Sequence, residues 1–252
     1  SAQTSAQPAV LQSEFLYEAM VAAWKLGATP QPISSRLPAA ERSAIIELAN
    51  PSIVVGVDPT EVPGRPTVPA SFEPEPSTPS EPLPPVVGAS FKAPTSGGST
   101  GRPKLIVATQ HATWEAISGF AGVLRIPAGG VHLVTGPLYH NGPFVTSLLA
   151  LLGGNHLVVM PRFDAEEALA LIERHAVDWM YAVPTMMHRI WRLPAAARAR
   201  YDLSSLRVLM HMAAPCPVWL KDAWIGWLGP ERILELYGGT EAQSFTVISG
   251  DE

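Results

Sequence analysis

Residues 157–183 read LVVMPRFDAEEALALIERHAVDWMYAV, and this stretch decides the fold class. Residues 157–160 and 179–183 form short apolar runs of the length expected for buried strands, and residues 164–175 between them have helical spacing. Asp164 followed by Glu167 is typical of a capped helix start. A strand, a helix and a strand in this order predict two parallel strands with a crossover helix.

The same alternation extends along most of the chain. Further strands are predicted at 53–57, 105–108, 132–135, 206–210 and 233–236, and further helices at 13–26, 38–48, 114–124, 143–152, 185–191 and 218–228. The sequence therefore predicts an α/β protein with helices layered on a largely parallel, buried sheet. In such sheets, ligands bind in the loops beyond the carboxyl ends of the strands.

Composition excludes several classes of protein. The chain of 252 residues has 17 Lys and Arg against 22 Asp and Glu, a net charge of −5, which excludes the basic excess of nucleic-acid-binding proteins. Cys216 is the single cysteine, so a disulfide framework and a Cys-rich zinc module are excluded. The most apolar stretch, 144–160, is interrupted by Gly153-Gly154-Asn155-His156, so no transmembrane segment is predicted. We expect a cytoplasmic protein, and a homo-oligomer is compatible with the composition.

Proline is concentrated between Pro59 and Pro85, where ten of the 26 prolines lie together with four glutamates. Proline lacks a backbone donor and the glutamates repel one another, so residues 59–85 are predicted to be an extended, exposed connection. A surface connection within one domain is favoured over a linker between domains.

The sharpest chemical feature is the string Ser96-Gly97-Gly98-Ser99-Thr100-Gly101-Arg102-Pro103-Lys104. Its three glycines let backbone N–H groups approach a ligand, and its hydroxyls and cations complement a polyphosphate. It differs from a Walker loop because Pro103 precedes the lysine and a β-like run, 105–107, follows it. An ordinary flexible hairpin is the alternative interpretation.

A second string, Tyr237-Gly238-Gly239-Thr240-Glu241, directly follows the predicted strand 233–236. Tyr237 offers a flat face to a base, Thr240 offers a hydroxyl to a phosphate, and Glu241 offers a carboxylate to Mg²⁺. Two glycines after a strand are also typical of a plain turn, so this string is a weak indicator by itself.

In this order, the two strings resemble the adenylate-forming superfamily of acyl-CoA synthetases, peptide adenylation domains and luciferases. Three further strings match its pattern: Pro137-Leu138-Tyr139-His140-Asn141-Gly142, Met212-Ala213-Ala214-Pro215 and Trp24-Lys25-Leu26-Gly27-Ala28. The Gly97-Gly98 pair resembles bacterial fatty-acid and steroid-acid CoA ligases. The resemblance implies that residues 13–252 are part of the layered α/β/α N-terminal AMP-binding domain. We expect the ribose-binding Asp, the hinge and the lysine-bearing C-terminal domain to be absent, and the chain alone to be inactive.

The resemblance implies a two-step reaction, in which a carboxylic acid and ATP give acyl-AMP and pyrophosphate before coenzyme A takes the acyl group. Ser96, Gly97, Gly98, Ser99, Thr100, Gly101 and Lys104 would hold the phosphates, and Ala213, Ala214, Pro215, Tyr237 and Gly238 would enclose adenine. Thr240 would contact the α-phosphate and Glu241 would bind Mg²⁺. His140 would border the acyl carboxylate and the thiol path, although a structural histidine has the same sequence signature.

Two residues next to these strings have less certain roles. His211 stands where the family often has serine, and either a nucleotide contact or core packing is expected. Cys216 has no neighbouring base and is predicted to be a small packed residue rather than a nucleophile.

The leading interpretation is a carboxylic acid–CoA ligase for a fatty, aromatic or sterol-derived acid. Apolar residues in segments that resemble pocket walls favour such a substrate, although they could equally be core: Phe144, Leu148, Trp179, Met186 and Met187. An amino-acid or acyl adenylation domain feeding a carrier protein is the nearest alternative, but Tyr139-His140-Asn141 offers no Asp for a substrate ammonium. A non-catalytic nucleotide-binding relative and a hydrophobic interaction module remain as alternatives of other classes.

Overall fold

The computed structural model describes residues 14–96, 103–241 and 244–252. The chain divides into two compact units, Ser1–Thr113 and Trp114–Glu252, and each is described by itself. None of the helices in the described ranges is both long and apolar enough to cross a membrane.

The first unit has short elements and a small core. It contains α2 (Glu14–Lys25), α3 (Ala39–Ala49), β1 (Val54–Val55), the 3₁₀ helix η2 (Pro59–Glu61), β2 (Thr67–Val68), β3 (Thr95–Ser96) and β4 (Lys104–Leu105). β1 and β2 are parallel, whereas β3 and β4 form an antiparallel pair. Ile46, Val54 and Val62 make the core that joins α3 to the β1–β2 region.

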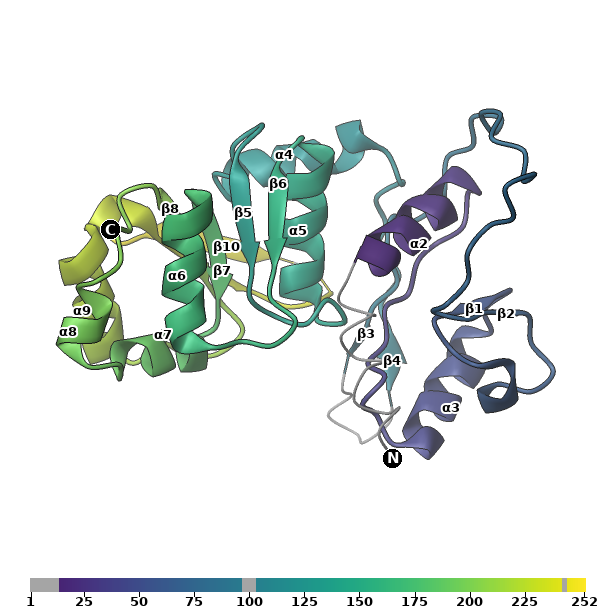
Figure 1. Cartoon of the computed structure of the whole chain (residues 1–252), viewed down its shortest axis with the longest axis horizontal. Helices are drawn as coiled ribbons and strands as arrows, with labels where there is room; N and C mark the ends of the chain where they lie inside the picture. Colours follow the sequence, from purple (N-terminus) through teal and green to yellow (C-terminus); the bar gives the residue numbers. More distant parts are fainter. Residues whose placement is uncertain (1–13, 97–102, 242–243) are drawn as a thin grey trace. The chain divides into compact units, whose positions relative to one another are not determined.

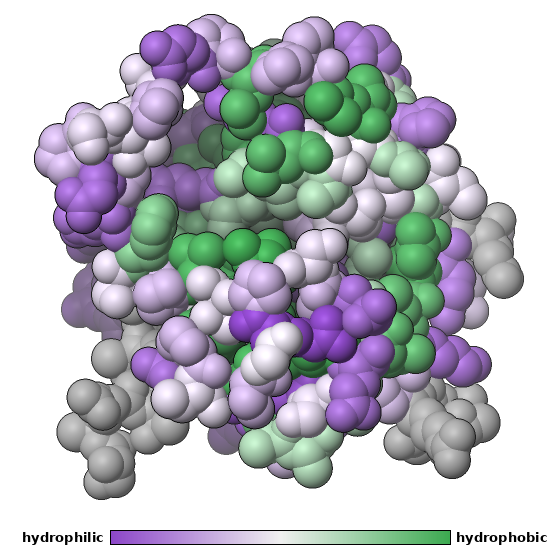
Figure 2. All heavy atoms as spheres, turned by 90° about the vertical axis from the view of Figure 1, so that its right-hand side faces the viewer, coloured by the Kyte–Doolittle hydropathy of each residue, from purple (hydrophilic) through white to green (hydrophobic). Residues whose placement is uncertain are grey.

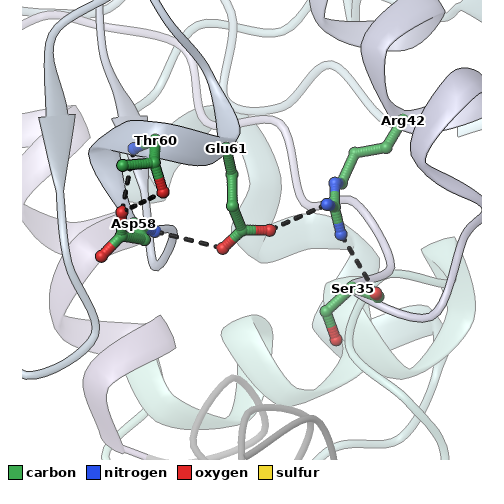
Figure 3. Close-up of polar contacts among 5 residues, drawn as sticks. All are labelled: Ser35, Arg42, Asp58, Thr60 and Glu61. Atoms are coloured by element: carbon green, nitrogen blue, oxygen red, sulfur yellow. Dashed lines mark hydrogen bonds and ion pairs between the residues drawn. The ribbon is translucent and has the colours of Figure 1, made fainter. Parts of the chain in front are cut away.

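A polar network supplements this small core (Figure 3). The Arg42 guanidinium donates to the Glu61 carboxylate at 2.8 Å and to the Ser35 carbonyl at 3.3 Å. Asp58 caps η2 by accepting from the Thr60 N–H at 2.9 Å, and Glu61 accepts from the Asp58 N–H at 3.2 Å. Arg42 thereby links α3 to the capped turn and to the loop before α3.

The Pro-rich stretch lies inside the first unit and is more structured than expected. Its beginning forms η2, which Asp58 caps, and β2, which pairs with β1. Val62, between the two, is buried. Residues 71–87 are all exposed. They include Phe72, Leu83, Val86 and Val87, and Figure 2, which views this side, shows separate apolar patches among polar ones.

The second unit is built on a six-stranded sheet in the order β10-β9-β8-β7-β5-β6 (Figure 1). The strands are β5 (Val131–Val134), β6 (His156–Val159), β7 (Trp179–Ala182), β8 (Val208–His211), β9 (Ile233–Gly238) and β10 (Phe245–Ser249). All neighbouring pairs are parallel except β9–β10. The helices are α4 (Trp114–Val123), α5 (Asn141–Leu152), α6 (Ala165–His175), α7 (Pro184–Trp191), α8 (Ala195–Arg198), α9 (Val218–Leu228) and the 3₁₀ helix η3 (Pro230–Arg232).

Strand alternation gives the sheet two buried faces. One core cluster joins Leu133, Met180, Leu209 and Ile233 of the strands to residues of α6, α7 and α9. Trp179 precedes Met180 on β7, so its side chain points to the opposite face of the sheet. Its indole donates to the Leu124 carbonyl at the end of α4, at 2.9 Å. Helices therefore cover both faces, and the predicted α/β/α layering is confirmed.

Most predicted elements of both units are present, with ends displaced by up to a few residues. Asp164 caps α6 as predicted, and its carboxylate accepts from the N–H groups of Glu166 and Glu167. The predicted strand 105–108 shortens to β4, because Pro94 on its partner has no N–H to continue the ladder. Helix α8 and strand β10 were not predicted.

His132 on β5 is a buried polar side chain that lacks a hydrogen-bond partner in the described part of the chain. Its ring is fully buried and stacks on Trp179 with centroids 4.4 Å apart. Neither ring nitrogen has a hydrogen-bond partner among the described residues, and burial lowers the pKa of His132 to about 3. The folded protein therefore keeps this imidazole neutral at pH values where the unfolded chain protonates it.

His132 should make the protein sensitive to acid. Because its pKa is lower in the folded than in the unfolded state, stability falls as the pH drops below about 6.5, by about 1.4 kcal/mol per pH unit. When the pH is lowered from 6.5 to 5, the free energy of unfolding of His132→Phe should fall by about 2 kcal/mol less than that of wild type. Urea unfolding at the two pH values measures this, with the exposed His156→Gln as control. Identical pH dependence of wild type and His132→Phe would contradict it.

Candidate functional site

The carboxyl edge of the sheet in the second unit gathers three of the sequence strings. β5, β8 and β9 run in the same direction, so the loops that follow them emerge at the same edge. The loop after β5 carries His140, the loop after β8 carries Ala213 to Pro215, and the turn after β9 carries Thr240 and Glu241. The structure thus brings together residues that are about a hundred positions apart in the sequence.

The loop of Met212, Ala213, Ala214 and Pro215, here called the β8 loop, lies beside the end of β9. The register places His211, the last residue of β8, opposite Glu235, so the β8 loop begins beside the last residues of β9. Ala213 has a φ of 76°, a left-handed backbone that is uncommon outside glycine. Such strain is concentrated at ligand-binding sites, and Ala213, Ala214 and Pro215 are all exposed.

Tyr237 is a strongly exposed aromatic residue at this edge. Its side chain is 79% exposed, although it lies in a strand whose other large side chains are mostly buried. A Cβ at Gly238 would lie 3.1 Å from that of Phe245, so this position favours a residue without a side chain. An exposed aromatic ring offers a flat face on which a base can stack.

Thr240 and Glu241 lie in the turn after β9. Thr240 is half-buried and Glu241 is exposed. No cation of the described ranges pairs with the Glu241 carboxylate. Among the same residues no group of three or more potential ligands could hold a metal by itself. One free carboxylate fits Mg²⁺ that arrives with a nucleotide, because Mg²⁺ retains waters and phosphate oxygens in such sites.

His140 precedes α5, which begins at Asn141 rather than near Pro143 as predicted. Its N–H donates to the Pro137 carbonyl at 3.0 Å, and its own carbonyl accepts from Phe144 at 3.1 Å. Its side chain makes no capping hydrogen bond, and its ring lies 4.5 Å from that of Tyr139. Desolvation by the surrounding protein lowers the pKa of His140, so at neutral pH its accessible ring acts as a neutral hydrogen-bonding group.

Tyr181 on β7 packs behind the His140 loop. Its carbonyl accepts from the Thr135 hydroxyl at 2.6 Å, and burial raises the pKa of its own hydroxyl to about 12. A Cβ at Gly142 would lie 2.8 Å from that hydroxyl oxygen, so only glycine lets α5 begin this close to β7. The backbone on both sides of His140 is therefore fixed by packing.

The glycine-rich string joins two strands of the first unit. Thr95 pairs with Leu105 and Ser96 with Lys104, so residues 97–102 connect an antiparallel hairpin. The expected extended segments on both sides are confirmed, and no helix follows the lysine as a Walker loop requires. Lys104 is exposed. The predicted phosphate ligands Gly97, Gly98, Ser99, Thr100 and Gly101 lie outside the described residues.

The proposed walls of an acyl pocket are mainly core residues. Phe144, Leu148, Trp179 and Met187 are at most 1% exposed. Trp179 bonds to the end of α4, whereas Met187 belongs to the cluster under α6, α7 and α9. Residues on opposite faces of one sheet cannot line a common pocket, so these residues do not define the substrate.

An ion pair between α9 and β9 was not predicted from the sequence. The Lys221 ammonium on α9 lies 2.6 Å from the Glu235 carboxylate on β9, and the fully buried His211 lies 4.0 Å from the same carboxylate. Of the two roles considered for His211, the structure supports core packing. Cys216 packs against the core, and burial raises the pKa of its thiol, which confirms its structural role. A glutamate within an otherwise apolar strand was the signal that could have revealed the pair.

The sequence is similar to those of several CoA ligases. A 4-chlorobenzoate–CoA ligase of Pseudomonas is 31% identical over 204 residues, which are 80% of this chain and 36% of that protein. A 4-coumarate–CoA ligase of Oryza sativa is 34% identical over 154 residues, which are 59% of this chain and 27% of that protein. A methyl-dioxo-octahydro-indenyl-propanoyl:CoA ligase of Mycobacterium tuberculosis is 32% identical over 148 residues, 58% of this chain and 29% of that protein. The chain thus spans about a third or less of these relatives.

Solved structures show the same fold. A protein from Rhodopseudomonas palustris described as a putative long-chain-fatty-acid CoA ligase superposes with a TM-score of 0.75 at 23% identity, over 94% of this chain and 63% of that one. A malonyl-CoA ligase bound to methylmalonyl-CoA and AMP superposes with a TM-score of 0.77 at 24% identity, over 95% of this chain and 53% of that one. The family model of AMP-binding enzymes matches residues 10–252, and the chain belongs to that family.

Proposed function

We propose that this chain is the nucleotide-binding part of an ATP-dependent carboxylic acid–CoA ligase. The observation that carries the proposal is the parallel pairing of β8 with β9, because the β8 loop and the turn with Thr240 and Glu241 then leave the sheet at the same edge. The CoA-ligase names of the curated relatives support this reaction class. Several of those relatives are named for ring-containing acids, and we propose a hydrophobic acid as the substrate class.

The first step joins the acid to AMP. A carboxylate oxygen attacks the α-phosphorus of ATP, the bond to the β-phosphate oxygen breaks, and pyrophosphate leaves with the electron pair. In our proposal Ala213, Ala214, Pro215 and Tyr237 hold adenine, and Thr240 donates to the α-phosphate. Ser96, the glycine-rich segment and Lys104 bind the departing pyrophosphate, whose negative charge grows as the bond breaks.

Glu241 is the proposed ligand for Mg²⁺. The ion, when bound with ATP, offsets the charge on the phosphate oxygens. Glu241 contributes an exposed carboxylate at the end of β9, on the same edge as the proposed adenine site. A single carboxylate and the phosphates together match the oxygen ligands that Mg²⁺ prefers.

The second step transfers the acyl group. The sulfur of coenzyme A attacks the acyl carbonyl, a thioester forms, and AMP leaves with its phosphate oxygen. We propose that His140 orients the acyl carbonyl by a hydrogen bond and gates the thiol path, because its side chain is exposed while its backbone is anchored. The same first step also suits an adenylation domain that feeds a carrier protein, and the acceptor distinguishes the two activities.

The proposal is tested by ATP–pyrophosphate exchange and by AMP release with a panel of carboxylic acids, with and without coenzyme A, on the full-length gene product. Exchange that depends on a hydrophobic acid, followed by thioester formation, is the expected result. Exchange without transfer to coenzyme A would favour a carrier-protein acceptor. Nucleotide binding without any exchange would favour a non-catalytic relative.

Glu241→Gln should slow the adenylation step by about 10²-fold, because one ligand that helps offset phosphate charge is lost. Lys104→Ala should mainly raise the KM for ATP. Glu231→Gln is the matched control, since Glu231 is an exposed glutamate that immediately precedes β9, at the opposite end of the strand. Normal pyrophosphate exchange in Glu241→Gln would show that this residue is not a metal ligand.

His140→Ala should lower the rate of acyl-CoA formation and leave the affinity for ATP nearly unchanged, because its proposed contacts are to the acyl group. Single-turnover rates of adenylation and thioester formation, measured separately, locate the affected step. His156→Ala at the start of β6 is the control. Wild-type rates of both steps in His140→Ala would leave His140 with only a structural role.

A further inference from the structure

A charged pair joins α9 to β9 close to His211, the residue that precedes the β8 loop. Lys221 and Glu235 are joined at 2.6 Å, and their side chains are 23% and 28% exposed. Lys221 comes from the beginning of α9 and Glu235 from the middle of β9. A pair shielded to this degree is worth more than a surface ion pair, and loss of one member leaves the other charge poorly solvated.

Lys221 is the cation that neutralises Glu235. His211 is the other basic group near this carboxylate among the described residues, with Nε2 at 4.0 Å from its oxygen. Burial lowers the pKa of His211, so its imidazole is neutral at pH 7. Without Lys221, no cationic side chain of the described residues would pair with the Glu235 carboxylate.

The charges of this pair act on the side chains at both ends of the β8 loop. His211 precedes the loop and Cys216 follows it. After burial, the Glu235 carboxylate and the Lys221 ammonium are the charges that shift the pKa of both side chains, in opposite directions. Glu235 is also two residues before Tyr237, so the two side chains point to the same face of the sheet.

We infer that Lys221 is a positioning residue for the nucleotide, because it cancels the Glu235 charge next to the surface that binds a polyanion. This inference rests on the proposed ATP-binding function and names a further residue required for it. An unpaired carboxylate two residues before Tyr237 should weaken the binding of the ATP polyanion by about tenfold at low salt. The chemical step should change little, because Lys221 does not contact the reacting atoms.

The test measures the KM for ATP and the kcat of pyrophosphate exchange in the full-length protein at 50 mM and 500 mM NaCl. Lys221→Met should raise the KM about tenfold at low salt and clearly less at high salt, with kcat within about twofold of wild type. Lys221→Arg should restore the wild-type KM. Arg174→Met, which removes the exposed Arg174–Glu167 pair on α6, should have no effect.

The double variant Lys221→Met/Glu235→Gln distinguishes charge from packing. It removes both charges, so it should fold even if Lys221→Met does not, and it should have the wild-type KM for ATP. Glu235→Gln alone should bind ATP at least as tightly as wild type. Thermal unfolding of each variant separates changes in stability from changes in the KM.

Three results would overturn the inference. A KM in the double variant as high as in Lys221→Met would mean that the pair acts through packing. An unchanged KM in a folded Lys221→Met would mean that Glu235 does not affect the nucleotide. If wild type neither binds nor uses ATP, the proposed function itself fails and the inference fails with it, an outcome visible before any variant is made.

Discussion

The parallel pairing of β8 with β9 is the constraint on which the proposed site depends. Its register sets His211, the last residue of β8, opposite Glu235, so the β8 loop begins beside the last residues of β9. Side chains alternate along a strand, so a shift by one residue would turn Glu235 away from Lys221 toward the other buried face. The register is thus held by the core packing of Leu209 and Ile233 as well as by the backbone hydrogen bonds.

Packing on both faces makes this edge a rigid support for exposed groups. The backbone around His140 is fixed by hydrogen bonds, and Tyr181 fills the space behind Gly142. Ala213 keeps a left-handed backbone where the β8 loop leaves the sheet. The groups offered to a ligand, namely Tyr237, Glu241 and the His140 ring, are exposed above these supports. Catalysis by positioning requires this combination of fixed backbone and accessible side chains.

Sequence patterns predicted the elements whose periodicity is strong. The strands and helices of the second unit were found because buried strands are short apolar runs and their crossover helices have caps and apolar stripes, as in α6 with Asp164. Helix α8 was missed because four residues carry no periodicity; it is held by Arg198, whose guanidinium lies 3.8 Å from the Trp191 ring and 5.3 Å from the Trp227 ring. Strand β10 was missed because its exposed, irregular pattern resembles a loop.

The sequence by itself determined the family, the α/β class and the strings around Lys104, His140, Pro215 and Glu241, because glycine, proline and charged residues at fixed spacing have few other uses. Only the tertiary structure decided which of these strings share an edge of the sheet, since strand order and register depend on contacts distant in sequence. It also decided that Trp179 and Met187 are core and that Lys221 meets Glu235. An apolar residue looks the same in a pocket or a core, and an ion pair between a helix and a strand has no local pattern; both become defined only when packing fixes the faces of the sheet.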